Sequence, residues 1–282
     1  ILTRGEVACL LAAVPVIEHR HNSPRLQQTL ERLTASQQQP QLNPAIRYPS
    51  HLRDYQKDGL SWLFTLYELG LGGILADDMG LGKTHQALAL IETIVRETTT
   101  STPILVVCPA SVLLHWADKI RRFYPDLPFA LYYGPDRDLE TALQQRILLT
   151  TYAVVRGDGE ILEQHPFDLI VFDEIQALKN RDTATHQACK ALRTRVAIGL
   201  SGTPIENSLG DLFAIFSICL PGFFGPFKTF QDSFIIPIEK YGSTQQEQLL
   251  TQRIQPFMLR RSRSKVLVEL AELIEDDRGC EL

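Results

Sequence analysis

The sequence predicts an α/β fold: a doubly wound, mainly parallel sheet that carries a helical insertion and a short N-terminal helical appendage. Short runs of consecutive apolar residues alternate with stretches of helical periodicity, as in sheets that helices cover on both faces. The chain of 282 residues is long enough to bury a large core. A turn that ends in Gly-Lys-Thr directly follows one apolar run, at the strand end where such sheets bind ligands.

The first 48 residues differ in composition from the rest of the chain. Short helices are predicted at residues 7–14 and 25–33, and the polar stretch at 37–41, interrupted by proline, is typical of a linker. We therefore interpret residues 1–48 as an N-terminal helical appendage and linker.

The main domain, predicted at residues 49–268, opens with an amphipathic helix at 54–69. Leu60, Leu63 and Tyr67 recur there at helical spacing, and glycines follow the last turn. Further apolar runs predict strands that are buried on both faces. The predicted strands are 74–76, 104–108, 130–133, 147–150, 169–172 and 196–200.

The last third of the chain has a different pattern. Residues 207–260 are first helical in periodicity and then rich in Phe, Pro and Gly, which predicts a mostly helical insertion packed on the sheet. Residues 269–282 are acidic and weakly patterned. We interpret them as a tail, or as a truncated link to a missing second lobe.

Composition limits the class of protein. The formal net charge of −5 argues against a globally basic coat for nucleic acid, but it leaves room for a local basic track. No run of about 18 apolar residues predicts a membrane span, and the start lacks the layout of a secretory signal. Because the first residue is Ile, we expect a fragment or a trimmed chain. The five cysteines do not follow metal-ligand spacing, which favours reduced thiols in a cytoplasmic protein.

The strongest functional signal is the glycine-rich loop between a predicted strand and the next helix. Gly80 and Gly82 allow a tight turn, and backbone N–H groups at the start of a helix bind phosphate. Lys83 is expected to reach the β- and γ-phosphates of ATP, and the hydroxyl of Thr84 to bind Mg²⁺. The strict pattern has glycine where this chain has Asp77, so a chance Gly-Lys-Thr turn is the alternative.

A second signal is the pair Asp173 and Glu174, directly after another apolar run. Asp173 is expected to hold Mg²⁺, directly or through water, and Glu174 to position the water that attacks the γ-phosphate in line. Alone, such a pair is often a solvated turn. Its position after the phosphate loop and further strands favours the catalytic interpretation.

Two weaker signals accompany these. Ser201 and Thr203 follow a buried strand, where small hydroxyl side chains can pass hydrogen bonds between sites, although Pro204 equally suits a helix start. Gln56 opens the first helix, and its amide, which donates and accepts together, suits the edge of adenine. A generic helix start is the alternative for Gln56.

Together these segments resemble the sucrose-non-fermenting (Snf) family of ATP-driven DNA translocases, within helicase superfamily two. The resemblance covers about residues 51–268, and it is of the prokaryotic type because Gln176 stands where many nuclear members have His. The matching segments are 52–59 with Trp62 and Leu63, 76–84, 107–112 with Trp116, 150–152, 173–180, 200–207 and 257–261.

The resemblance implies a recombinase-A-like lobe that binds ATP with Mg²⁺ and grips double-stranded DNA, in the cytoplasm and, in a prokaryote, at the nucleoid. Arg53 would join Gln56 in binding the adenine, and Ser201 and Thr203 would couple the ATP state to the grip on DNA. Hydroxyl and backbone N–H groups suit phosphate contacts that do not read sequence. The residues implied to lie at the DNA are Pro109, Ser111, Thr151 and Tyr152.

The family's second lobe supplies arginine fingers from a motif Gln-x-x-Gly-Arg-x-x-Arg, which we do not find; Arg260, Arg261 and Arg263 do not fit its spacing. An arginine finger accelerates turnover by about 10³–10⁵. We therefore expect the chain alone to bind ATP and hydrolyse it slowly, with a second recombinase-A-like lobe in missing sequence or in a partner chain. A nucleotide-binding remnant is one alternative, and an RNA helicase or a P-loop ATPase that needs no nucleic acid is another.

Overall fold

The computed structural model describes residues 46–202 and 208–266. The helices predicted at 7–14 and 25–33, and the tail at 269–282, lie outside these residues. Among the helices that the structure describes, none has both the length and the apolar content needed to cross a bilayer.

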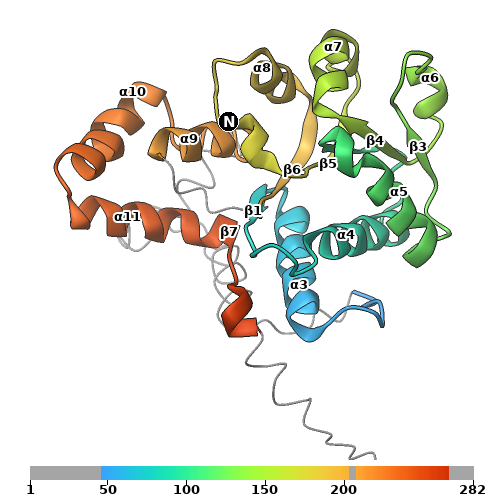
Figure 1. The fold of residues 1–282 in the computed structure, drawn as a ribbon, viewed down its shortest axis with the longest axis horizontal. Helices are drawn as coiled ribbons and strands as arrows, with labels where there is room; N and C mark the ends of the chain where they lie inside the picture. The colour runs from blue at the N-terminus through green and yellow to red at the C-terminus, as the bar shows by residue number, and fades with distance from the viewer. Residues whose placement is uncertain (1–45, 203–207, 267–282) are drawn as a thin grey trace, which may run out of the picture.

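The described chain is built on one seven-stranded sheet in which all the strands run parallel (Figure 1). The strand order is β3-β4-β2-β5-β6-β1-β7, so β2 to β6 lie on one side of β1 and β7 lies on the other, and the predicted α/β class is confirmed. The strands are β1 Gly73–Leu75, β2 Ile104–Cys108, β3 Phe129–Leu131, β4 Ile147–Thr151, β5 Phe167–Phe172, β6 Thr194–Leu200 and β7 Met258–Leu259.

Helices cover both faces of the sheet. The pair α3 and α4 packs together on one face, and α7 and α8 pack together on the other (Figure 1). Helix α3 ends where predicted, because Gly70 adopts a left-handed φ of 69° and its N–H caps the last turn. The α-helices are α3 Asp54–Leu69, α4 Lys83–Glu97, α5 Ala110–Phe123, α6 Leu139–Ala142, α7 Tyr152–Leu162, α8 Ala184–Ala191, α9 Leu209–Cys219, α10 Phe227–Phe230 and α11 Thr244–Ile254; η2 Ile175–Leu178 and η4 Gln255–Phe257 are 3-10 helices and η3 Gln231–Lys240 is a π-helix.

The central strands are mainly apolar because both of their faces are buried against other parts of the fold. Strand β5 lies between β2 and β6, with Val171 opposite Val106 on one side and Ile198 on the other, and all three are fully buried. This burial on both faces removes the alternation of polar and apolar residues that a half-exposed strand would show.

Residues 209–257 form an aromatic layer on the sheet. Phe224 and Phe230 lie with ring centroids 4.5 Å apart, and the ring of Phe223 contacts that of Phe257 at 5.2 Å. These contacts explain the density of Phe in the segment, since each buried ring removes a large apolar area from water.

The described part of the predicted insertion at 207–260 is mostly helical, but it ends in a strand that the sequence does not predict. Met258–Leu259 forms β7, which pairs with β1 so that Ile74 lies opposite Met258. Two residues are too short to show a strand period. Their conformation is set by the open edge of β1, which only the folded sheet provides.

Candidate nucleotide-binding site

The glycine-rich loop lies between β1 and α4, at the carboxyl end of the sheet. Gly80 and Gly82 adopt φ of 86° and 75°, which side chains disfavour, so glycine is required at both positions. Helix α4 begins at Lys83, which turns its free N–H groups toward the loop. The loop therefore has the positive-φ glycines and the helix start that a phosphate site requires, and phosphate binding by it stays a prediction.

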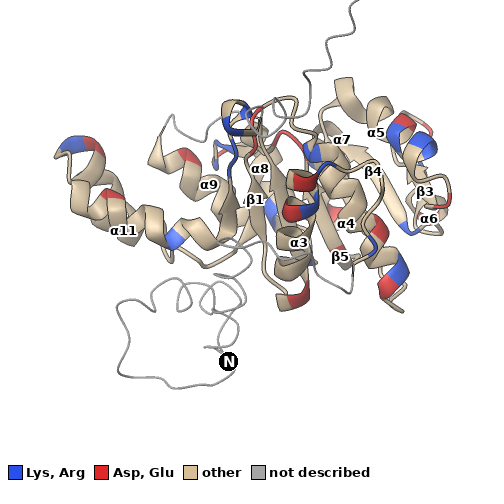
Figure 2. Cartoon of the chain, turned by 90° about the horizontal axis from the view of Figure 1, so that it is seen from below, with Lys and Arg blue, Asp and Glu red and all other residues tan. Residues whose placement is uncertain are grey.

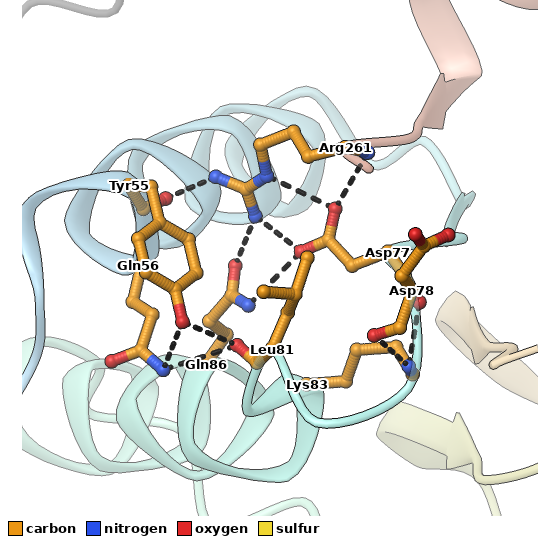
Figure 3. A network of polar contacts seen from close by, with 8 residues as sticks. All are labelled: Tyr55, Gln56, Asp77, Asp78, Leu81, Lys83, Gln86 and Arg261. Carbon is orange, nitrogen blue, oxygen red and sulfur yellow. Dashed lines mark hydrogen bonds and ion pairs between the residues drawn. The ribbon is translucent and has the colours of Figure 1, made fainter. Parts of the chain in front are cut away.

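Lys83 folds back over this loop. Its Nζ donates hydrogen bonds to the carbonyl oxygens of Asp77, at 2.6 Å, and Asp78, at 3.2 Å (Figure 3). Partial burial lowers the pKa of Lys83, and the surrounding carboxylates oppose this. A side chain at Gly202 would come within 3.4 Å of this Nζ and 3.9 Å of Glu174 Oε1. Lys83, Glu174 and the turn after β6 therefore meet at one point.

Asp173 follows β5 and is only 8% exposed. Its Oδ2 accepts a hydrogen bond of 2.7 Å from the indole Nε1 of Trp116, and its carbonyl accepts one of 2.7 Å from the hydroxyl of Tyr152. Burial raises the pKa of the Asp173 carboxyl group, and the Trp116 bond opposes that rise. Helix α5 thus holds the carboxylate of Asp173, and α7 holds its backbone.

Glu174 has an unusual backbone. Its φ of 50° is the one positive value at a non-glycine residue among those the structure describes. A conformation of this kind costs about 1–3 kcal/mol and is retained where surrounding contacts enforce it. Here the N–H of Glu174 donates to Asp173 Oδ1 at 3.0 Å, and Gln176 Nε2 donates to Glu174 Oε2 at 2.5 Å.

A chain of hydrogen bonds connects this carboxylate to the end of β6. The hydroxyl of Ser201, which is fully buried, donates to Gln176 Oε1 at 3.0 Å, and Gln176 in turn donates to Glu174. The predicted coupling residue Ser201 therefore reaches Glu174 through one side chain. Thr203 lies outside the described residues.

The donor set fits a magnesium ion with a nucleotide. Thr84 lies half-buried in the first turn of α4, one residue after Lys83, and Asp173 faces the same charged centre. A hydroxyl and a carboxylate are hard oxygen ligands of the kind that Mg²⁺ prefers, together with phosphate oxygens and water.

Gln56 does not present a free amide. Its Oε1 accepts from the N–H of Arg53 at 3.0 Å. Its Nε2 donates to the carbonyl of Leu81 at 3.1 Å and to Tyr55 Oη at 3.3 Å, as Figure 3 shows. In this conformation Gln56 ties α3 to the phosphate loop. Adenine binding by Gln56 and Arg53 stays a prediction; the side chain of Arg53 is exposed.

The residues predicted at DNA divide into two pairs. Pro109 and Ser111 lie at the start of α5, with Ser111 exposed. Thr151 and Tyr152 are buried: the Thr151 hydroxyl accepts from the N–H of Val154, and Tyr152 bonds to Asp173. A direct side-chain contact with DNA is therefore not available to Thr151 and Tyr152 in this conformation, because both hydroxyls lie inside the fold.

The charged residues are distributed over the described elements, with basic and acidic residues intermixed along those visible in Figure 2. Lys119, near the end of α5, is half-buried. Burial lowers its pKa, and the nearby carboxylate of Asp173 opposes this effect.

Reasoning from the sequence missed the contacts of two residues, one that bonds to the site and one that follows the phosphate loop. Trp116 entered only through the family resemblance, yet it bonds directly to Asp173. His85, where the family usually has an apolar residue, packs edge-on against Phe123 with ring centroids 4.9 Å apart, and its pKa falls to about 4 because of burial. Neither contact has a signal in the local sequence, because the partners are distant along the chain.

Comparison with known proteins decides the family. The SNF2-related domain matches residues 55–282. The chain belongs to the SNF2 family. The SWI2/SNF2 ATPase core of Sulfolobus solfataricus, solved in complex with double-stranded DNA, is similar with a TM-score of 0.73 and 40% sequence identity, over 79% of this chain and 47% of that chain.

Curated SNF2-family relatives are much longer proteins. YwqA of Bacillus subtilis, named for an ATP-dependent helicase/translocase, is 36% identical over 261 residues, which are 90% of this chain and 28% of YwqA. The chromatin-remodeling ATPase INO80 of Arabidopsis thaliana is 35% identical, over 89% of this chain and 18% of its own length. The chain therefore spans less than a third of these relatives, and the part that it matches is an ATPase domain of the SNF2 family.

Proposed function

We propose that this SNF2-family chain is the ATP-binding lobe of an ATP-dependent double-stranded DNA translocase, which hydrolyses ATP with Mg²⁺ and couples hydrolysis to movement along DNA. The observation that carries the proposal is the meeting of Lys83, Asp173 and Glu174 at the carboxyl ends of the strands. Ser201 is linked to the same point through Gln176. An anion-binding loop, a magnesium ligand and a base for water are the parts that phosphoryl transfer requires.

Each residue has a distinct part in the chemistry. The loop N–H groups and Lys83 bind the β- and γ-phosphates, for which Lys83 exchanges its bonds to the Asp77 and Asp78 carbonyls. Thr84 and Asp173 hold Mg²⁺, which when bound neutralises phosphate charge. Glu174 orients the attacking water and accepts its proton, while Gln176 keeps this carboxylate in place.

DNA binding is coupled to the magnesium site by the helices whose side chains bond to Asp173. Trp116 belongs to α5, which begins beside the predicted DNA contacts Pro109, its N-cap residue, and Ser111, and Tyr152 opens α7. Both side chains donate hydrogen bonds to Asp173. A shift of α5 on DNA would therefore move the magnesium ligand directly.

A second recombinase-A-like lobe, in sequence outside these residues or in a partner chain, completes the proposed motor. Support comes from the Sulfolobus core, of which this chain covers 47%. The arginine-finger motif of that lobe does not occur in these 282 residues. We therefore propose slow turnover by the chain alone.

The test is ATP hydrolysis by the chain with and without duplex DNA, beside Glu174→Gln and Lys83→Ala. We expect nucleotide binding in the parent and in Glu174→Gln, no turnover above background in Glu174→Gln, and binding lost in Lys83→Ala. Equal nucleotide affinity in Lys83→Ala and the parent would refute the site. Stimulation by RNA but not by duplex DNA would refute the proposed substrate.

A further inference from the structure

Asp77 stands where the strict phosphate-loop pattern has glycine, and its carboxylate is fully buried. Arg261, which lies 184 residues later, forms a two-pronged ion pair with it (Figure 3). Arg261 Nε donates to Asp77 Oδ1 at 3.0 Å and Nη2 donates to Oδ2 at 2.5 Å. A buried carboxylate is tolerated only with such partners, so Asp77 and Arg261 require one another.

Backbone bonds join the same two segments. The N–H of Ala76 donates to the Leu259 carbonyl at 2.8 Å, and the N–H of Asp78 donates to the Arg261 carbonyl at 3.1 Å. In return, the N–H of Arg261 donates to Asp77 Oδ1 at 3.0 Å, and that of Arg263 donates to Asp78 Oδ2 at 2.9 Å. Residues 258–263, which we call the clamp segment, therefore lie along the first half of the phosphate loop.

Two helices close around the Arg261 guanidinium. Gln86 on α4 accepts from Nη2 at 2.7 Å and donates to Asp77 Oδ2 at 3.2 Å, and Nη1 bonds to the carbonyl of Tyr55 on α3. Gly59 makes room for this arrangement, because a Cβ there would lie 1.8 Å from Gln86 Oε1 and 2.7 Å from Arg261 Nη2. Every nitrogen of the guanidinium is therefore engaged inside the lobe.

The same residue, Asp77, is held from its other side by Lys83. The carbonyl of Asp77 accepts from Lys83 Nζ at 2.6 Å, while its carboxylate is bonded to Arg261. One residue of the loop thus connects the clamp segment to the lysine that reaches phosphate. A change at either end alters where this peptide group lies.

We propose that Arg261 is a positioning residue for the nucleotide site, which holds the phosphate loop in its binding conformation through Asp77, so that docking of the clamp segment and binding of nucleotide favour one another. The inference rests on the proposed function of the loop. It assigns a role to Asp77, and it places Arg261 beneath the loop rather than at the γ-phosphate. Nucleotide binding and clamp docking are then linked equilibria, and each must strengthen the other by the same factor.

The first test compares Arg261→Gln and Arg261→Lys with Arg263→Gln as a matched control. Arg263 lies in the same segment and carries the same charge, but its side chain is exposed and only its backbone N–H bonds to the loop. The probe is a fluorescent ADP analogue with Mg²⁺, and thermal unfolding monitors the fold. We expect at least tenfold weaker binding in folded Arg261→Gln, a smaller loss in Arg261→Lys, and less than threefold change in Arg263→Gln.

An equal loss of ADP affinity in Arg261→Gln and Arg263→Gln would overturn the proposal, because it would show a general effect of charge. Unchanged ADP affinity in a destabilised Arg261→Gln would also overturn it, because Arg261 would then only stabilise the fold. In both cases the parent still binds nucleotide and Lys83→Ala does not, so the proposed function is unaffected by the failure of this proposal. A parent chain that binds no nucleotide overturns both.

Hydrogen exchange of the parent chain tests the linkage even if Arg261→Gln fails to fold. The amides of Asp78, Arg261 and Arg263 are donors between the loop and the clamp segment. We expect Mg²⁺ and ADP to slow their exchange, with no change at the edge strand β3 as the internal reference. Exchange at these three amides that is indifferent to saturating nucleotide would overturn the proposal.

Discussion

Trp116→Phe isolates one hydrogen bond at the proposed magnesium site. The change keeps a buried aromatic ring in α5 but removes the indole N–H that donates to Asp173 Oδ2 at 2.7 Å. A hydrogen bond to a charged group contributes about 1.5–3 kcal/mol, and losing a partner of a metal ligand typically costs about 10–100-fold in metal affinity. The two magnitudes agree, because about 1.4 kcal/mol corresponds to a factor of ten.

The assay is a Mg²⁺ titration of fluorescent ADP binding at fixed nucleotide concentration. We expect the Mg²⁺ concentration at half-saturation to rise about 10–100-fold in Trp116→Phe. The Trp116 bond holds down the pKa of Asp173, which burial raises, so binding in the variant should also fail at a higher pH as the solution is acidified. Leu114→Ala, on the same helix with a side chain 64% exposed, is the control. A folded Trp116→Phe with the parent's Mg²⁺ dependence would refute the assigned role of this bond.

Three further predictions concern other parts of the fold. Ser201→Ala breaks the chain to Glu174 through Gln176 and should lower DNA-stimulated turnover several-fold at unchanged ADP affinity; a parallel loss of affinity would contradict a coupling role. Burial lowers the folded-state pKa of His85 to about 4, so protons bind the unfolded chain first and stability is lost as pH falls from about 6.5 to about 4. Because His85 is partly exposed, His85→Leu should recover only about 1 kcal/mol of the stability that the parent loses between pH 7 and pH 5 in urea titrations. A variant that loses as much stability as the parent would argue against this role of His85. Phe230→Ala should lower the free energy of unfolding by about 3–5 kcal/mol in the same titrations, and a cost under about 1 kcal/mol would show that the aromatic layer repacks.

The sequence by itself determined most strands of the sheet and the glycine-rich loop between a strand and a helix. Strand β2 and residues 169–172 of β5 are runs of apolar residues long enough to stand out, and helix α3 is bounded by its periodicity and by Gly70. Lys83 and Thr84 could be predicted as nucleotide ligands because every part of a phosphate loop lies within one turn between a strand and a helix. Where nearby residues in the chain set the local structure, the local sequence pattern is enough to predict it.

Only the tertiary structure decided what surrounds these residues. Strand β7 forms because β1 offers an open edge, and the carboxylate of Asp77 is acceptable because Arg261 arrives from 184 residues away. Trp116 and Asp173 are 57 residues apart and meet only when α5 packs over the sheet. Burial makes such pairings necessary, since a polar group without water must find its partner in the fold, and the sequence does not state which distant residue that will be.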